Sequence, residues 1–68
     1  MTVGQRMRQL REERGWRPTY LAVEADIRWE SIYRYERDCS LPCLETFCKI
    51  CKALGVTTDE FLKGVEFK

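Results

Sequence analysis

Two short helical segments joined by a tight turn constrain this chain more than any other feature. The sequence predicts one helix over 18–25 and another over 29–37, with three residues left for the connection. Pro18 suits the first position of a helix, where its missing N–H is not needed. Asp26 tolerates the left-handed backbone conformation that ends a helix. The buried face of the first segment is predicted to consist of Leu21, Ala22 and Ala25.

Three further helices are predicted around this pair, over 2–14, 43–54 and 58–63. In the first, apolar side chains recur at i, i+4 and i+7, which is one face of an amphipathic helix: Val3, Met7 and Leu10. The apolar stripe of the next is predicted to contain Leu44, Phe47, Cys51 and Leu54. Thr58 is the expected N-cap of the last helix, with two acids in its first turn.

The chain therefore reads as one all-α domain over residues 1–68, with a frayed tail at 64–68 unless Val65 and Phe67 dock. A 68-residue domain buries only about 60% of the surface that its unfolded chain exposes. The 44% apolar content argues against disorder. There is no apolar run of about 20 residues to span a membrane, and the N-terminus lacks the apolar core of a signal peptide. We expect a cytoplasmic protein without membrane association.

Charge is nearly balanced overall but is unevenly distributed by residue type. The formal net charge is +1, all eight arginines lie at or before Arg37, and all four lysines lie at or after Lys49. Nucleic-acid binders are usually more basic than this. Any DNA binding must therefore come from the local placement of arginines, and ordinary solvated helix faces would account for most of the charges.

The predicted helix over 29–37 has an unusual outer face. Ile32 and Tyr35 are placed toward the core at i and i+3. The remaining large or charged side chains fall on or near the outer face: Trp29, Glu30, Tyr33, Arg34 and Arg37. Solubility alone does not explain two aromatics and two arginines on one exposed face.

Four cysteines lie within thirteen residues in the pattern C-x3-C-x4-C-x2-C: Cys39, Cys43, Cys48 and Cys51. Structural zinc sites usually pair two separated C-x2-4-C knuckles, whereas Cys48 and Cys51 fall in the middle of a predicted helix. Cys51 also lies on the core stripe, where a small apolar residue fits. We expect structural or incidental cysteines and no metal, with redox-responsive or metal-binding thiols as the alternatives.

Taken in order, these segments resemble the Cro/repressor-type helix-turn-helix family, the lambda-repressor-like five-helix domain. The stretches that carry the resemblance are VGQRMRQLREERGW, YLAVEADI, SIYRYER, LPCLETFCKICKALGV and TTDEFL. They cover roughly residues 3–63, so the resemblance includes nearly the whole chain. It implies a compact all-α DNA-binding domain whose helix-turn-helix consists of the second and third helices.

The resemblance also implies roles for individual residues. Arg11 and Glu36 occupy the positions of a buried ion pair. Base readout falls to positions on or beside the third helix: Arg28, Trp29, Glu30, Tyr33 and Arg34. Phosphate contacts, which fix register but carry no sequence information, fall to Arg17, Thr19, Tyr20 and Arg37. Arg34 is the best candidate for direct readout, because a bidentate arginine matches guanine O6 and N7.

Three positions depart from the family pattern. The start of the second helix often carries a polar pair such as Ser-Gln, where this chain has Arg17-Pro18. The N-cap of the third helix is often Ser or Thr, where this chain has Arg28. The glycine that usually follows the third helix is replaced by Asp38. These changes leave the fold intact but weaken the expected phosphate clamp.

The function implied is a sequence-specific double-stranded DNA-binding transcriptional regulator, a repressor acting as a homodimer on a palindromic operator. The expected dimer interface consists of Val56, Phe61, Leu62, Val65 and Phe67, of which Phe61 or Leu62 should be partly core. The alternative is a protein-interaction module, such as an antitoxin or partner-binding subunit, because aromatics and Arg also favour protein interfaces. We expect no enzyme activity, cofactor or small-molecule effector: the chain has no His, no Gly-rich phosphate loop and no second domain.

Overall fold

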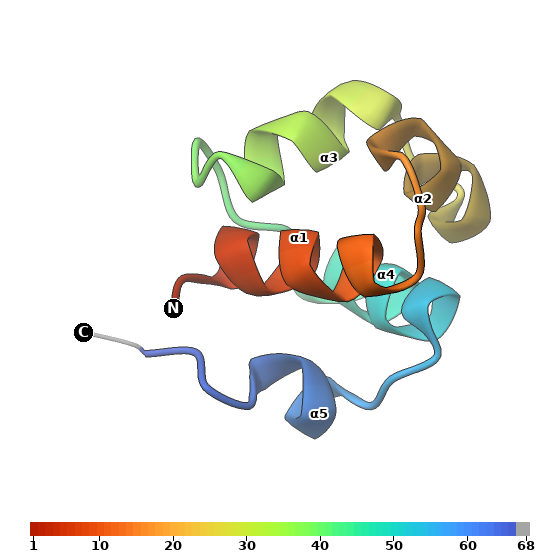
Figure 1. Ribbon diagram of the computed structural model, residues 1–68. Helices are drawn as coiled ribbons and strands as arrows, with labels where there is room; N and C mark the ends of the chain where they lie inside the picture. Colours follow the sequence, from red (N-terminus) through yellow and green to blue (C-terminus); the bar gives the residue numbers. More distant parts are fainter. Residues whose placement is uncertain (67–68) are drawn as a thin grey trace.

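The computed structural model describes residues 1–66, which form five α-helices connected by short loops (Figure 1). The helices are α1 (Val3–Glu13), α2 (Pro18–Ala25), α3 (Trp29–Glu36), α4 (Leu44–Leu54) and α5 (Thr58–Leu62). No strand occurs in this part of the chain. The prediction of an all-α five-helix domain is confirmed, and the predicted helix boundaries differ from these by at most one residue.

Helix α1 begins and ends where its sequence provides capping groups. The Thr2 hydroxyl accepts from the Gln5 amide, and the Gln5 side chain accepts from the Thr2 amide, which is a capping box. Beyond the C-terminus, Gly15 has a positive φ of 71°, a conformation open to glycine without steric cost. The chain can therefore turn at once from α1 toward α2.

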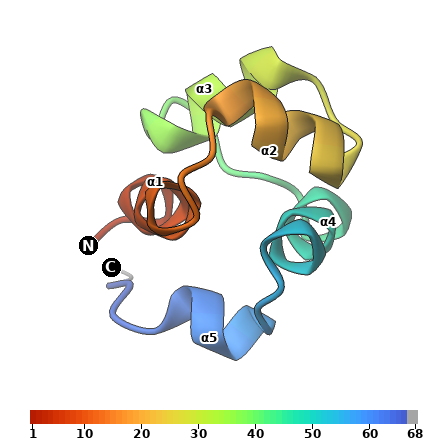
Figure 2. The ribbon, with the colours of Figure 1, turned by 45° about the vertical axis from the view of Figure 1, so that its right-hand side comes forward.

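The turn between α2 and α3 depends on Asp26. Its φ of 57° and ψ of 48° are left-handed, and its backbone N–H bonds back to α2. Pro18 occupies the start of α2, as predicted. Figure 2 shows α2 and α3 together on one side of the molecule, with α1, α4 and α5 completing the ring around the core.

Each helix contributes one fully buried side chain to the core: Met7, Leu21, Ile32, Ile50 and Phe61. Leu10, Ala22, Ala25, Cys51 and Leu54 complete the same cluster. Phe47 and Phe61 meet edge to face with their ring centroids 4.9 Å apart. Every helix is therefore anchored in one shared core cluster.

Two predicted details of the C-terminal half are wrong. Leu44 is 77% exposed and does not belong to the core stripe, because it occupies the first turn of α4 beyond the edge of the core. The N-cap of α5 is Thr57, whose hydroxyl accepts from the Glu60 amide in a second capping box. Thr58 is instead the first residue of the helix.

Residues that follow α5 are tied to the start of the chain. The Met1 ammonium donates to the Gly64 carbonyl at 3.0 Å, and the Glu66 amide donates to the Met1 carbonyl at 3.1 Å. The Arg6 guanidinium donates to the carbonyls of Glu60 and Phe61 at the end of α5. Residues 64–66 are therefore held by hydrogen bonds and Val65 is partly buried, whereas Phe67 lies outside the described residues.

Candidate nucleic-acid interface

A buried ion pair joins α1 to the end of α3. Arg11 Nε lies 2.7 Å from Glu36 Oε2, and Arg11 Nη2 lies 2.8 Å from Oε1, so the pair is bidentate. Both side chains are only 9% exposed. The remaining Arg11 Nη1 donates to the Trp16 carbonyl at 2.7 Å. Hydrogen bonding to Glu36 raises the pKa of Arg11, and the pair fixes α3 against α1.

A second polar contact joins the residues that follow α3 to the N-terminal end of α1. Asp38 follows α3 with a positive φ of 58°, so it adopts the conformation of the glycine that usually stands there. Its carboxylate accepts from the Thr2 hydroxyl at 2.7 Å and from the Gly4 amide at 3.1 Å. Sequence reasoning treated Asp38 only as a departure and missed this role.

The outer face of α3 is open to solvent. The five residues expected to read bases are all exposed: Arg28, Trp29, Glu30, Tyr33 and Arg34. Trp29 and Tyr33 pack edge to face, with ring centroids 5.4 Å apart. Arg37, also exposed, places its Cζ atom 5.9 Å from the centre of the Tyr33 ring. The structure therefore gathers aromatic, cationic and acidic groups on one convex helix face.

The residues expected to contact phosphates near α2 are exposed as well. Arg17, Thr19 and Tyr20 lie at the start of α2 and line a shallow groove with Trp16 and Val23. Trp16 supports the Tyr20 ring edge to face at a centroid distance of 4.9 Å. A hydrogen bond to Glu24 raises the pKa of Tyr20 above its ordinary value.

The four cysteines occupy two kinds of environment. Cys39, Cys43 and Cys48 are exposed, Cys51 is buried, and all four are free thiols. Burial raises the pKa of Cys51 to about 11, whereas a hydrogen bond with Thr46 lowers the pKa of Cys43. Within residues 1–66, the structure brings together no group of three or more His, Cys, Asp or Glu side chains suited to a metal ion.

This geometry suits a helix-turn-helix, in which the second helix of the motif enters the major groove of DNA. Helix α2 packs against α3, and the Arg11–Glu36 pair and Asp38 tie the C-terminal end of α3 to the two ends of α1. None of the helices among residues 1–66 is long and apolar enough to cross a membrane.

Comparison with known proteins agrees with this architecture. A family model described as a helix-turn-helix domain matches residues 2–62. The HTH-type transcriptional regulator DdrOP3 of Deinococcus deserti is 37% identical over 67 residues, which are 98% of this chain. The chain spans about half, 52%, of the length of that relative. The chain therefore belongs to the Cro/repressor-type family of helix-turn-helix domains.

Solved structures give the same result for the fold. The DNA-binding domain of the P22 C2 repressor matches with a TM-score of 0.88 and 28% identity, over 94% of this chain and 84% of that domain. The biofilm master regulator SinR, in a crystal structure with DNA, matches with a TM-score of 0.84 and 27% identity. That match covers 90% of this chain and 98% of SinR's.

Proposed function

We propose that this protein is a sequence-specific double-stranded DNA-binding repressor that acts as a homodimer on a palindromic operator. The observation that carries the proposal is the exposed face of α3, where Trp29, Glu30 and Arg34 are presented on a helix fixed from behind. A helix held in this way can enter the major groove without losing its orientation. Family membership supports the same function.

Base recognition is assigned to α3. The Arg34 guanidinium can donate two hydrogen bonds to guanine O6 and N7, a contact that contributes about 1–3 kcal/mol of discrimination. Trp29 offers an apolar surface to a thymine methyl, and Glu30 can accept from a cytosine amino group. Glu30 also repels phosphates, so it rejects wrong sequences more than it adds affinity. Arg28 and Tyr33 flank this set.

Backbone anchoring is assigned to exposed groups on either side of α3. Arg17, Thr19 and Tyr20 lie at the start of α2, and Arg37 lies just beyond the end of α3. Such contacts hold the protein in register on the duplex. The Pro18 ring removes one backbone donor from this region, so the arginines have to supply most of the anchoring.

A dimer is required because one helix contacts too few base pairs for an operator. Two-fold dimers place their recognition helices about 34–36 Å apart, in successive major grooves. Of the residues expected at the interface, Phe61 is fully buried and belongs to the core. Val56, Leu62 and Val65 are only partly exposed, so they contribute at the margin.

We place the main dimer contact on an apolar groove of about 330 Å³ that includes Leu62 and lies outside α3. Its lining residues come from α1, the connection after α3, α4 and α5: Val3, Leu41, Pro42, Leu44, Phe47 and Leu62. Leu41 and Leu44 are 71% and 77% exposed, and a partner's apolar surface would shield both side chains from water. A second copy is the proposed occupant, because both copies can then present α3 to DNA.

Selection of bound sequences from a random duplex library tests the DNA proposal. We expect a palindrome, whose half-site spacing gives the dimer geometry. Arg34→Ala should then relax preference at one position in each half-site. Equal loss across all sequences would make Arg34 a phosphate contact instead, and failure to enrich any sequence would refute sequence-specific binding.

Sedimentation of two lysine variants tests the proposed dimer surface. Leu44→Lys should weaken dimers, whereas Val23→Lys, at a side chain that is 75% exposed on α2, should leave them unchanged. Equal association of the two variants would place the interface elsewhere.

The competing function is a protein-interaction module on the same fold. The net charge of +1 and the exposed rings of Tyr20, Trp29 and Tyr33 favour this reading. Salt dependence separates the two functions, since counterion release makes DNA affinity fall steeply as salt rises. A flat salt response, or no binding to any duplex, would favour the interaction module.

A further inference from the structure

A polar hollow of about 300 Å³ lies between α1, the start of α2 and the end of α3. Its lining residues come from all three helices and from the residue after α3: Arg8, Arg11, Pro18, Tyr33, Glu36 and Arg37. It adjoins the exposed face of α3 through Tyr33 and lies at the start of α2, where the family's usual polar pair is missing. Arg8 was not singled out by sequence reasoning.

The charges around this hollow leave a net positive site. Arg11 and Glu36 neutralise each other in their bidentate pair and form its inner wall. The other charged lining residues are Arg8 and Arg37, both exposed cations. The Tyr33 side chain brings a hydroxyl, which is a hydrogen-bond donor, and its ring lies beside the Arg37 guanidinium. Two guanidiniums and a hydroxyl form a donor set that suits a phosphate oxygen.

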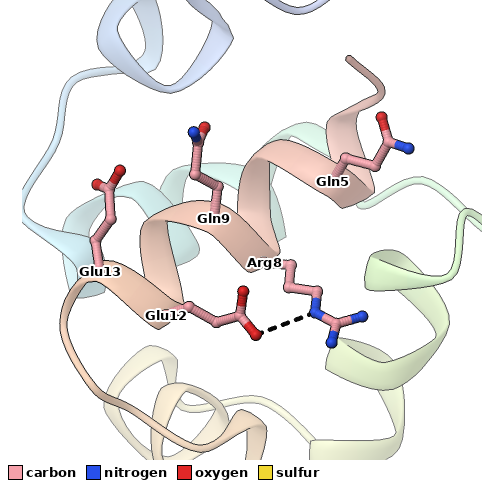
Figure 3. Close-up of a pocket in the computed structure, with 5 residues that line it drawn as sticks. All are labelled: Gln5, Arg8, Gln9, Glu12 and Glu13. Atoms are coloured by element: carbon pink, nitrogen blue, oxygen red, sulfur yellow. Dashed lines mark hydrogen bonds and ion pairs between the residues drawn. The ribbon is translucent and has the colours of Figure 1, made fainter.

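Arg8 is held ready for such a contact by a weak intrahelical pair. Its Nε lies 3.2 Å from Glu12 Oε2, and the two side chains are 63% and 55% exposed. Figure 3 shows Arg8 and Glu12 on one side of α1, while Gln9 and Glu13 project from another. Within residues 1–66, only Nε of this guanidinium forms a hydrogen bond, so both terminal nitrogens can bind another group.

We propose that this hollow binds one phosphate of the DNA backbone beside α3, with Arg8 and Arg37 as the two cationic contacts. The proposal rests on the DNA-binding function proposed above and adds α1 to the interface. Pro18 forms one wall but has no N–H to donate, so Arg8 takes over anchoring at the start of α2. Glu12 orients Arg8 in the free protein and competes with the phosphate for its guanidinium.

The first test measures affinity for a labelled duplex of random sequence at several salt concentrations, because phosphate contacts do not depend on sequence. Arg8→Gln should reduce the slope of log affinity against log salt by less than about 0.9, the value for one released counterion, because Arg37 still contacts the same phosphate. Lys52→Gln, which removes one exposed charge from α4, should leave the slope unchanged. Equal slopes for the wild type and Arg8→Gln would overturn the proposal.

Two further variants test the shared site directly. Glu12→Gln should raise affinity, because it removes the competing carboxylate while leaving Arg8 in place. Arg8→Gln and Arg37→Gln should be less than additive when combined, since both arginines bind the same phosphate. Full additivity would assign the two arginines to separate phosphates and refute the composite site.

Failure of this proposal differs from failure of the DNA-binding function. If the wild type shows no salt-dependent binding to any duplex, the function itself is wrong. If the wild type binds but Arg8→Gln matches it, only the phosphate site is wrong.

Inorganic phosphate provides a third comparison, monitored at the Arg8 Nε–H resonance by NMR. A shift caused by duplex but not by equivalent free phosphate supports a backbone site, whereas equal shifts would indicate a general anion site and overturn the proposal.

Discussion

The contact between α1 and α3 and the contact between α4 and α5 hold their helices by different means. Between α1 and α3, the bidentate pair of Arg11 and Glu36 and the Asp38 carboxylate form short, directional bonds. Between α4 and α5, the rings of Phe47 and Phe61 pack edge to face. Directional bonds fix the distance and angle of a helix, whereas apolar packing mainly fixes its burial. The helix proposed to read DNA is the one held by directional bonds.

The largest expected effect on stability comes from removing one partner of the ion pair between Arg11 and Glu36. Glu36→Ala leaves Arg11 buried and unpaired, and should lower the free energy of unfolding by about 3–5 kcal/mol. Denaturant unfolding measures the loss. If Glu36→Ala fails to fold, Arg11→Met combined with Glu36→Leu provides the second measurement. That double variant should be more stable than Glu36→Ala, because no charge is left buried. An unchanged stability in Glu36→Ala would refute a structural role for the pair.

High pH should lower the free energy of unfolding through Cys51, a buried residue of α4. Its pKa is raised by burial to about 11, from an ordinary value of 9.0. The unfolded chain therefore loses this proton first, and stability present below pH 9 is lost as the pH rises toward 11. The loss attributable to Cys51 should reach about 2–3 kcal/mol.

Unfolding curves of the wild type and Cys51→Ala measure this contribution by difference, because tyrosines and lysines titrate in both proteins. The wild type should lose more stability than the variant between these pH values. Parallel pH profiles would show that the thiol does not remain buried.

Close approach of α1 and α3 is tested at Gly4. A Cβ atom there would clash with the Tyr35 carbonyl and lie 2.9 Å from the Glu36 carbonyl. The Asp38 carboxylate lies 2.7 Å from the same position, and because the other two obstacles are backbone atoms α3 must shift, so Gly4→Ala should cost about 1–3 kcal/mol. Thermal unfolding measures this, with Glu13→Ala as an exposed control on α1 that should change stability by less than about 0.5 kcal/mol. Equal melting temperatures would contradict the close contact.

The smallest expected effect on stability comes from glycine substitution at Asp38, with Asp26 as the matched control position. Their φ values are 58° and 57°, so glycine relieves the same backbone strain at both positions. Asp38 bonds to Thr2 and Gly4, whereas within residues 1–66 the Asp26 side chain has no hydrogen bond in the structure. Asp38→Gly should therefore be less stable than Asp26→Gly by about 1 kcal/mol. Equal stabilities of the two variants in chemical denaturation would show that the Asp38 contacts do not stabilise the fold.

Local sequence patterns predicted the helices and most of the core. Met7, Leu21 and Ile32 were assigned to the core from periodicity, and the structure buries all three completely. The left-handed residue Asp26 could be predicted because it lies between two periodic segments. The error at Leu44 arose because periodicity gives the face of a helix but not where along it the core ends.

Long-range polar contacts could not be predicted from local patterns. The bonds from Arg6 to the end of α5 and from Asp38 to Thr2 join residues far apart in the sequence. The pairing of Arg11 with Glu36 was anticipated only through the family resemblance. The hollow beside Arg8 depends on how α1, α2 and α3 meet, which no single helix pattern contains.

The positions of the two tryptophans give the protein separate optical reporters. Trp16 is partly buried, packs on the core and lies just beyond α1, so its fluorescence should follow unfolding. Trp29 is 51% exposed on the face proposed to enter the major groove, so its emission should change when DNA covers it. Substituting either one by Phe would leave a single emitter, so that folding and DNA binding can be observed separately without an added dye.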